Sequence, residues 1–166
     1  MKLTGGYFMI KNICLFIFSA LILFGNTAFA DNTAEALKFF RNYVNAANTY
    51  DKSLLDMYSP NARIIRQVIK PDGELVDVET DTETYIKQLR MGQMTARFRR
   101  YKNTYSNIKA EKVSNGYKIS ALRQPSGEKY KLKSYMIITK QSDGEWKITE
   151  ELMQTKVQLF LKYANK

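Results

Sequence analysis

The chain has 166 residues, with 26 Lys and Arg against 16 Asp and Glu, which gives a formal net charge of +10. It has no histidine and a single cysteine. These counts exclude His-dependent nucleophile systems, imidazole proton shuttles, His-ligated zinc and an intrachain disulfide. A composition that is 45% hydrophobic and 25% charged is typical of a globular protein, and the length predicts one domain.

Residues 1–30 have the pattern of a secretory signal peptide. Lys2 and Lys11 lie before or at the start of the apolar run 13–24, and small residues then lead to Ala30. As a helix, this run is too short to cross a membrane by itself. We therefore expect cleavage near Ala30 and a periplasmic or secreted domain of residues 31–166. An uncleaved membrane anchor is the alternative.

Helical periodicity predicts three helices in this domain. Apolar residues recur at three- and four-residue spacing from Thr33 to Ala47, with Asn32 or Thr33 as the N-cap. A short helix over 53–57 should end before a Ser-Pro pair, because the residue before proline disfavours helical dihedrals. A third helix is expected to begin at Asp81.

The rest of the domain has strand patterns separated by turn residues. Two strands around a Pro-Asp-Gly turn predict a hairpin, and Asn-Gly, Ser-Gly and Asp-Gly pairs separate the later strands. The expected strands are 62–69, 74–80, 98–113, 117–124, 128–141 and 146–156.

The order of these elements and three segments carry a family resemblance. The segments are LLDMYSPNARII (54–65), TETYIKQL (82–89) and GEWKITEELMQ (144–154). Together they resemble the nuclear transport factor 2-like superfamily, also called SnoaL-like or cystatin-like α+β cone proteins. The resemblance implies an α+β fold in the order α-α-β-β-α-β-β-β-β, with the helices packed in the concave face of a strongly curved, mostly antiparallel sheet. It also implies a homodimer formed through the open sheet face.

Such a cone can hold a small apolar ligand, and the last strand suggests which residues line it. Successive side chains of a strand alternate between its two faces, so Trp146, Ile148, Glu150 and Leu152 share one face. We expect this face to point into the cone, in a pocket that also includes Tyr58, Tyr101 and Tyr105. A carboxyl at position 150 among apolar neighbours could act as an acid or base. The alternative is that Glu150 lies at the mouth, solvated or paired with an arginine such as Arg66.

The superfamily contains enzymes and pure binding proteins, so the fold does not decide the function. Resemblance to the ketosteroid isomerases would require an Asp base with a Tyr and an acid, for which Tyr43, Asp56 and Asp77 are further candidates. No catalytic motif matches, and we assign no catalytic residue, cofactor or metal. We expect a non-catalytic binding protein. A small lyase or isomerase, and an assembly module of an envelope or secretion complex, are the alternatives.

Positive charge is concentrated in the middle of the chain. Residues 87–133 contain thirteen Lys and Arg and two acids. They predict an anion-binding surface made of Arg97, Arg99, Arg100, Lys102, Lys129, Lys131 and Lys133, the three lysines sharing one face of a strand. Its partner would be an anionic component of the cell envelope, and nucleic acid is not expected there. A solvated face that blocks edge-to-edge pairing is the alternative.

Overall fold

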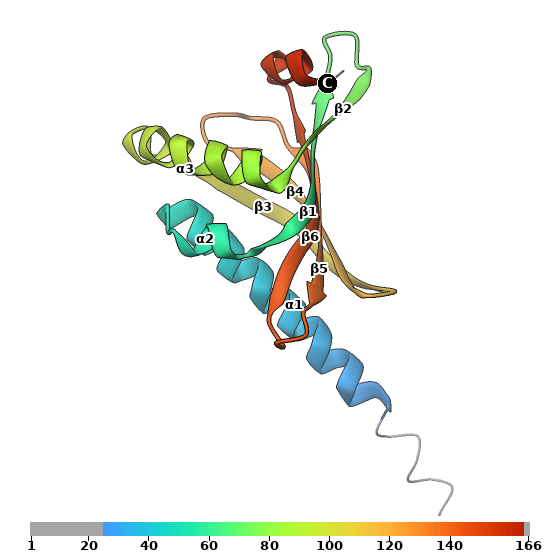
Figure 1. Cartoon of the computed structure of the whole chain (residues 1–166). Coiled ribbons are helices and arrows are strands. Elements are labelled where there is room, and N and C mark those ends of the chain that lie inside the picture. Colours follow the sequence, from blue (N-terminus) through green and yellow to red (C-terminus); the bar gives the residue numbers. More distant parts are fainter. Residues whose placement is uncertain (1–24, 165–166) are drawn as a thin grey trace, which may run out of the picture.

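The computed structural model describes residues 25–164, and it gives side chains from Thr33 onward. Three α-helices lie on one face of a single six-stranded sheet, and a short 3₁₀ helix follows the last strand (Figure 1). The elements are α1 (Gly25–Thr49), α2 (Ser53–Asp56), β1 (Tyr58–Ile69), β2 (Leu75–Thr80), α3 (Thr82–Phe98), β3 (Asn103–Val113), β4 (Gly116–Pro125), β5 (Leu132–Lys140), β6 (Trp146–Thr155) and η1 (Gln158–Tyr163). The predicted fold class is confirmed.

The sheet has the strand order β2-β1-β6-β5-β4-β3. The pair β1 and β6 is parallel, and every other neighbouring pair is antiparallel. The three turns that contain Gly73, Gly127 and Gly144 were predicted from the sequence, and each of these glycines has a positive φ. Gly116 serves a different purpose, because a Cβ atom there would lie 1.9 Å from the Ile138 carbonyl oxygen on β5.

The core lies between the helices and the concave face of the sheet. Helix α1 contributes Phe40 and Tyr43, both 3% exposed, and packs against β3 and β4. Helix α3 packs against β1 through Tyr85. The sheet contributes fully buried isoleucines, whose burial stabilises the fold by about 1.5–3 kcal/mol each; on this face they are Ile64, Ile119, Ile138 and Ile148.

Helix α1 begins at Gly25, so the predicted N-cap at Asn32 or Thr33 is wrong. Residues 25–32 contain no proline, and nothing in them stops the helix from extending toward the N-terminus. Residues 1–24 of the predicted signal peptide lie outside the described residues, and cleavage near Ala30 stays a prediction. None of the helices in residues 25–164 is both long enough and apolar enough to cross a membrane.

The strand predicted from residue 98 begins only at Asn103, because α3 continues through Phe98 and ends in a Schellman motif. Arg100 has a φ of +52°, its N–H donates to the Arg97 carbonyl, and the Tyr101 N–H donates to the Ala96 carbonyl. This position usually holds glycine, so an arginine there is no sign of a helix end in the sequence.

The strand predicted over 128–141 is also shorter, since β5 begins at Leu132. Lys129 and Lys131 therefore belong to the connection between β4 and β5, and only Lys133 lies on the strand. The three lysines are exposed, but they do not form the continuous strand face that their alternation predicted.

Candidate functional site

A cavity of about 530 Å³ opens between the helices and the concave face of the sheet. Helices α1 and α3, the strands β4 and β6, and the segment around η1 all contribute to its wall. The wall is mostly apolar and aromatic, and its principal residues are Tyr43, Tyr50, Leu54, Leu89, Ala96, Tyr101, Tyr105, Tyr130, Leu132, Met153, Val157 and Phe160. Two arginines, Arg66 and Arg123, add positive charge to the same wall, and the exposed side chains of Glu128 and Lys156 also belong to it.

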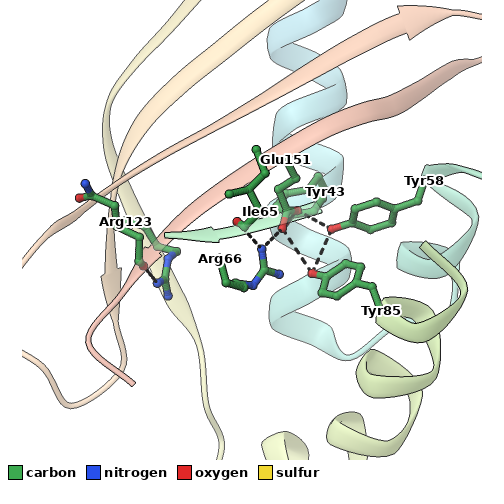
Figure 2. A network of polar contacts seen from close by, with 8 residues as sticks. Tyr43, Tyr58, Ile65, Arg66, Tyr85, Arg123 and Glu151 are labelled. Carbon is green, nitrogen blue, oxygen red and sulfur yellow. Dashed lines mark hydrogen bonds and ion pairs between the residues drawn. The ribbon is translucent and has the colours of Figure 1, made fainter. Parts of the chain in front are cut away.

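A buried carboxylate, Glu151, is surrounded by four hydrogen-bond donors at one side of this cavity. Its Oε1 accepts from Arg66 Nη1 at 2.8 Å and from the Tyr85 hydroxyl at 3.4 Å. Its Oε2 accepts from the hydroxyls of Tyr58 at 2.5 Å and Tyr43 at 3.2 Å. Figure 2 shows Tyr58 and Tyr85 side by side with their hydroxyls turned toward Glu151. Each carboxylate oxygen thus has two donors, which fills its ordinary capacity.

The three tyrosines of this cluster remain protonated at neutral pH. Burial raises the pKa of Tyr85 to about 12. Burial, followed by the negative charge of Glu151, raises the pKa of Tyr43 and of Tyr58 well above 10. The Arg66 guanidinium, 4.8 Å from the centre of the Tyr85 ring, supplies the opposite charge. The cluster is therefore a neutralised ion pair whose oxygens are held by hydroxyl donors.

The last strand does not keep the alternation that the sequence predicted. Ile138 on β5 pairs with Ile148, whereas Ile137 pairs with Glu150, so Thr149 is an extra residue on β6. This β-bulge shifts the side-chain alternation by one position. Before the bulge Ile148 points to the core, and after it Glu151 does so, with side-chain exposure of 1%.

The prediction that Glu150 points into the cone is therefore wrong. Its carboxylate accepts a hydrogen bond from the Tyr135 hydroxyl at 2.6 Å and lies 3.6 Å from Arg63, on the opposite face of the sheet. Leu152 is on that face too, opposite Ile65 and Tyr135 in the ladder. The alternative pairing of Glu150 with Arg66 is also wrong, because the partner of Arg66 is Glu151.

The remaining predicted pocket residues are distributed over three places. Tyr101 and Tyr105 line the cavity between the helices and the sheet. Tyr58 and Ile148 are buried in the core beside it. Trp146 lines a separate pocket at the other end of the sheet, where its ring packs edge-on against Tyr117 and its Nε1 donates to Glu35 at 3.3 Å.

The further isomerase candidates do not form a catalytic group. Asp56 lines the pocket that contains Trp146, and Asp77 accepts a hydrogen bond from Gln67 on an exposed part of β1. Only Tyr43 reaches a buried carboxylate, and that carboxylate is Glu151. Within residues 25–164, no group of three or more Asp, Glu, Cys or His side chains could hold a metal ion.

Arg123 carries a buried positive charge in the cavity wall. It is 7% exposed, its Nη1 donates to Asn103 Oδ1 at 2.9 Å, and its Nη2 donates to the Gln154 carbonyl at 2.8 Å. Its Nε has no hydrogen-bond partner among the described residues. Figure 2 shows Arg123 apart from the Glu151 cluster. Arg66 is paired with Glu151, whereas none of the ion pairs between described residues involves Arg123.

The predicted anion-binding residues lie on two segments that a backbone hydrogen bond joins, and neighbours of these residues line the cavity. The Lys102 carbonyl accepts a hydrogen bond from the Ser126 N–H, which joins the end of α3 to the connection between β4 and β5. Ala96 and Tyr101 line the cavity from the first segment, and Glu128 and Tyr130 line it from the second. All seven predicted cationic side chains are exposed, and Lys133 lies on β5 whereas the other six lie in α3 or in connections.

No protein-family model matches this chain, and no curated protein matches it. The fold is similar to that of several solved structures. An NTF2-like protein of unknown function from Pseudomonas putida has a TM-score of 0.57 at 10% identity, covering 75% of this chain and 87% of that one. An NTF2-like protein with a cystatin-like fold from Novosphingobium aromaticivorans has a TM-score of 0.56 at 6% identity, covering 87% and 90%.

A third similar structure, provisionally described as a ketosteroid isomerase, comes from Shewanella frigidimarina, with a TM-score of 0.50 at 14% identity, covering 70% of this chain and 91% of that one. Identities this low establish the fold alone. The chain has the nuclear transport factor 2-like fold that its sequence pattern predicted.

Sequence reasoning missed the residues that define the cavity's polarity. Glu151 was hidden by the bulge at Thr149, which has no turn residue to mark it. Tyr85 lies at an apolar position of the third helix, and its sequence position alone does not indicate a contact with a carboxylate. For Arg123 a signal existed in the sequence, because it shares one side of its strand with Tyr117, Ile119 and Ala121.

Proposed function

We propose that this protein binds a small amphiphilic ligand in its cone and does not transform it. The observation that carries the proposal is the cavity of about 530 Å³ with a largely aromatic wall. Ligand sites in proteins typically measure about 300–1,000 Å³ and combine an apolar lining with a few polar groups. The aromatic and aliphatic side chains of α1, α3 and β6 would contact the apolar part of the ligand.

The charge balance of the wall favours a ligand with an anionic group. A buried cation without a counter-charge is costly, and a carboxylate or phosphate in the cavity would offset that cost. Arg123 is such a cation, whereas the charge of Arg66 is already matched by Glu151. The guanidinium of Arg123 uses two of its five N–H groups in the hydrogen bonds to Asn103 and Gln154, so donors remain for a ligand.

Binding is favoured over turnover because the buried carboxylate beside the cavity is not free to act as an acid or base. The carboxylate of Glu151 is 1% exposed and accepts four hydrogen bonds, so it has no free lone pair for a substrate proton. The tyrosines beside it have raised pKa values and stay neutral. The lyase or isomerase alternative and the homodimer stay predictions.

A titration with three chain-matched probes tests the ligand class. We expect dodecanoate to bind at least tenfold more tightly than dodecanol, and dodecyltrimethylammonium to bind more weakly than either. Arg123→Met should remove the preference for dodecanoate and leave the binding of dodecanol unchanged. Equal affinity of the intact protein for dodecanoate and dodecanol would reject the anionic group, and failure of all three probes to bind would reject the cone site.

Filling the cavity provides a second test that does not depend on the probe's charge. Ala96 lines the cavity from α3, whereas Ala34 is exposed on α1 outside it. We expect Ala96→Trp to lower the affinity for dodecanoate at least tenfold and Ala34→Trp to leave it unchanged. Native mass spectrometry of the purified protein should show a bound anionic amphiphile that Ala96→Trp removes.

We also propose that the protein acts outside the cytoplasm after removal of residues 1–30. The pattern of a basic start, an apolar run and small residues before Asp31 supports this. Intact-mass measurement of the protein from its native cells should give a chain that begins at Asp31. A mass that includes residues 1–30 would favour the retained anchor.

A further inference from the structure

Helix α3 exposes a row of large apolar side chains on its outer side. Met91 is 73% exposed, Met94 is 82% exposed and Phe98 is 89% exposed. Spacings of three and four residues place them on one side of the helix. The opposite side is the one that packs, since Tyr85 is buried and Leu89 packs against the core. The outer row is therefore apolar surface that the fold of this chain does not cover.

The same segment is strongly cationic. Residues 84–110 contain seven Lys and Arg and no Asp or Glu. Arg90 and Arg97 lie within α3, and Arg99, Arg100 and Lys102 follow its last turn. Cations are favoured at a helix C-terminus by the helix dipole, which accounts for some of this charge. The dipole gives no reason for two methionines and a phenylalanine in water beside it.

The same helix also borders the cavity, but with another side than the exposed row. Gly92, Gln93 and Ala96 line the cavity from α3, and the helical spacing places them away from Met94 and Phe98. Val157, which follows β6, lines the cavity and is 53% exposed. Helix α3 therefore contributes to the cavity wall on one side and exposes an apolar row on the other.

We propose that α3 docks on the surface of an anionic phospholipid bilayer, with Met91, Met94 and Phe98 in the interfacial region and Arg90, Arg97, Arg99 and Arg100 at the lipid phosphates. We call these seven residues the α3 rim. A helix with an apolar row beside Lys and Arg is the pattern that lies in a membrane interface. Each cation near an anionic bilayer strengthens the attraction to it.

A second copy of the chain fits this surface less well than a bilayer does. A symmetric contact through α3 would bring two sets of arginines together with no acidic residue from the same segment between them. A bilayer supplies both an apolar phase and negative charge at one surface. The proposal does not depend on whether the cone holds a ligand, so it goes beyond the proposed function.

Co-sedimentation of the full chain with vesicles tests the docking. The vesicles contain phosphatidylcholine, either alone or with 30% phosphatidylglycerol. The apolar residues 13–24 are present in every variant and contribute equally to vesicle binding. The result is therefore the difference in bound fraction between each variant and the parent. We expect Met94→Ser with Phe98→Ser to lower binding to the phosphatidylglycerol vesicles about tenfold or more. Arg97→Gln with Arg99→Gln should lower it about twentyfold, with a weaker salt dependence. Ile108→Ser, 42% exposed on β3, is the matched control and should bind as the parent does.

An orientation measurement separates docking through α3 from attachment by another segment. Phe98→Trp should show a blue-shifted emission with phosphatidylglycerol vesicles and should be quenched by brominated lipid, whereas Ile108→Trp and the native Trp146 should not. Unchanged binding of the Met94→Ser, Phe98→Ser variant would overturn the proposal. So would loss of binding only in a Lys129→Gln, Lys131→Gln, Lys133→Gln variant. A dimer in solution that the serine variant dissociates would assign α3 to a contact between copies instead.

Discussion

Replacing Glu151 by glutamine removes one negative charge from the core while it keeps the volume of the side chain. The carboxylate is the only charged partner of Arg66 among the described residues, at 2.8 Å. Arg66 has a side-chain exposure of 12%, so water cannot take over the role of the carboxylate. The variant therefore leaves a cation in the wall of the cone without a counter-charge.

The expected cost follows from the burial of both partners. Breaking a buried ion pair by removing one partner destabilises a protein by about 3–5 kcal/mol. The hydroxyls of Tyr43, Tyr58 and Tyr85 also lose a charged acceptor, which weakens their hydrogen bonds. We expect Glu151→Gln to lower the free energy of unfolding by about 4 kcal/mol, a large part of the stability of a domain of this size.

Urea unfolding monitored by circular dichroism measures this loss. The adjacent Glu150→Gln is the matched control, because its carboxylate faces a half-exposed arginine on the outer side of the sheet, and we expect a loss of about 1 kcal/mol or less. Adding Arg66→Met to Glu151→Gln should recover about half of the loss, since no unpaired charge remains. Equal losses for the two glutamine variants, or no recovery in the double variant, would refute the reasoning.

Three further predictions follow from burial and backbone geometry. The three buried tyrosines should leave the free energy of unfolding unchanged near neutral pH and should lower it between pH 10 and 12, because unfolded tyrosines ionise there while Tyr43, Tyr58 and Tyr85 stay protonated in the fold. The slope is about 4 kcal/mol per pH unit for the three, measured by urea unfolding with phenolate absorbance at 295 nm, and a flat profile in this range would contradict it. Gly92→Ala should raise the melting temperature and stabilise α3 by about 0.5–1 kcal/mol, because the added Cβ meets no atom within 4 Å; no gain would mean that the helix is not formed at that position. Gly116→Ala should cost about 3 kcal/mol or more in the same assay, because its Cβ would meet a carbonyl oxygen of β5 at 1.9 Å, and an unchanged stability would contradict the close approach of the two strands.

The sequence was sufficient for the types and order of the elements, and the family resemblance implied their general arrangement. Periodicity found the helices, and Asp81 was correctly expected to begin α3, where its carboxylate accepts the Thr84 N–H at 2.8 Å. Glycine-containing turns located the hairpins because a positive φ strongly favours that residue. These signals are local, so a single sequence carries them.

The sequence failed where tertiary structure overrides a local rule. Arg100 adopts a left-handed conformation without being glycine, so the end of α3 was placed before the residues that complete it. Thr149 is an extra residue in β6 that depends on pairing with a distant strand, and no local pattern marks it. The bulge at Thr149 is also the reason why the candidate site differs from the prediction. It shifts the alternation by one residue, so that Glu151 and not Glu150 points into the core.

The extra residue at Thr149 determines which carboxylate of the last strand points into the cone. Glu150 and Glu151 are consecutive and chemically equivalent, and one lies on each side of the sheet. Deleting Thr149 would exchange their roles without changing either side chain. When other chains of this fold are superposed, the carboxylates of their final strands should therefore be compared by the face of the sheet on which they lie. An alignment by sequence position alone would equate a carboxylate inside the cone with one on the outer face.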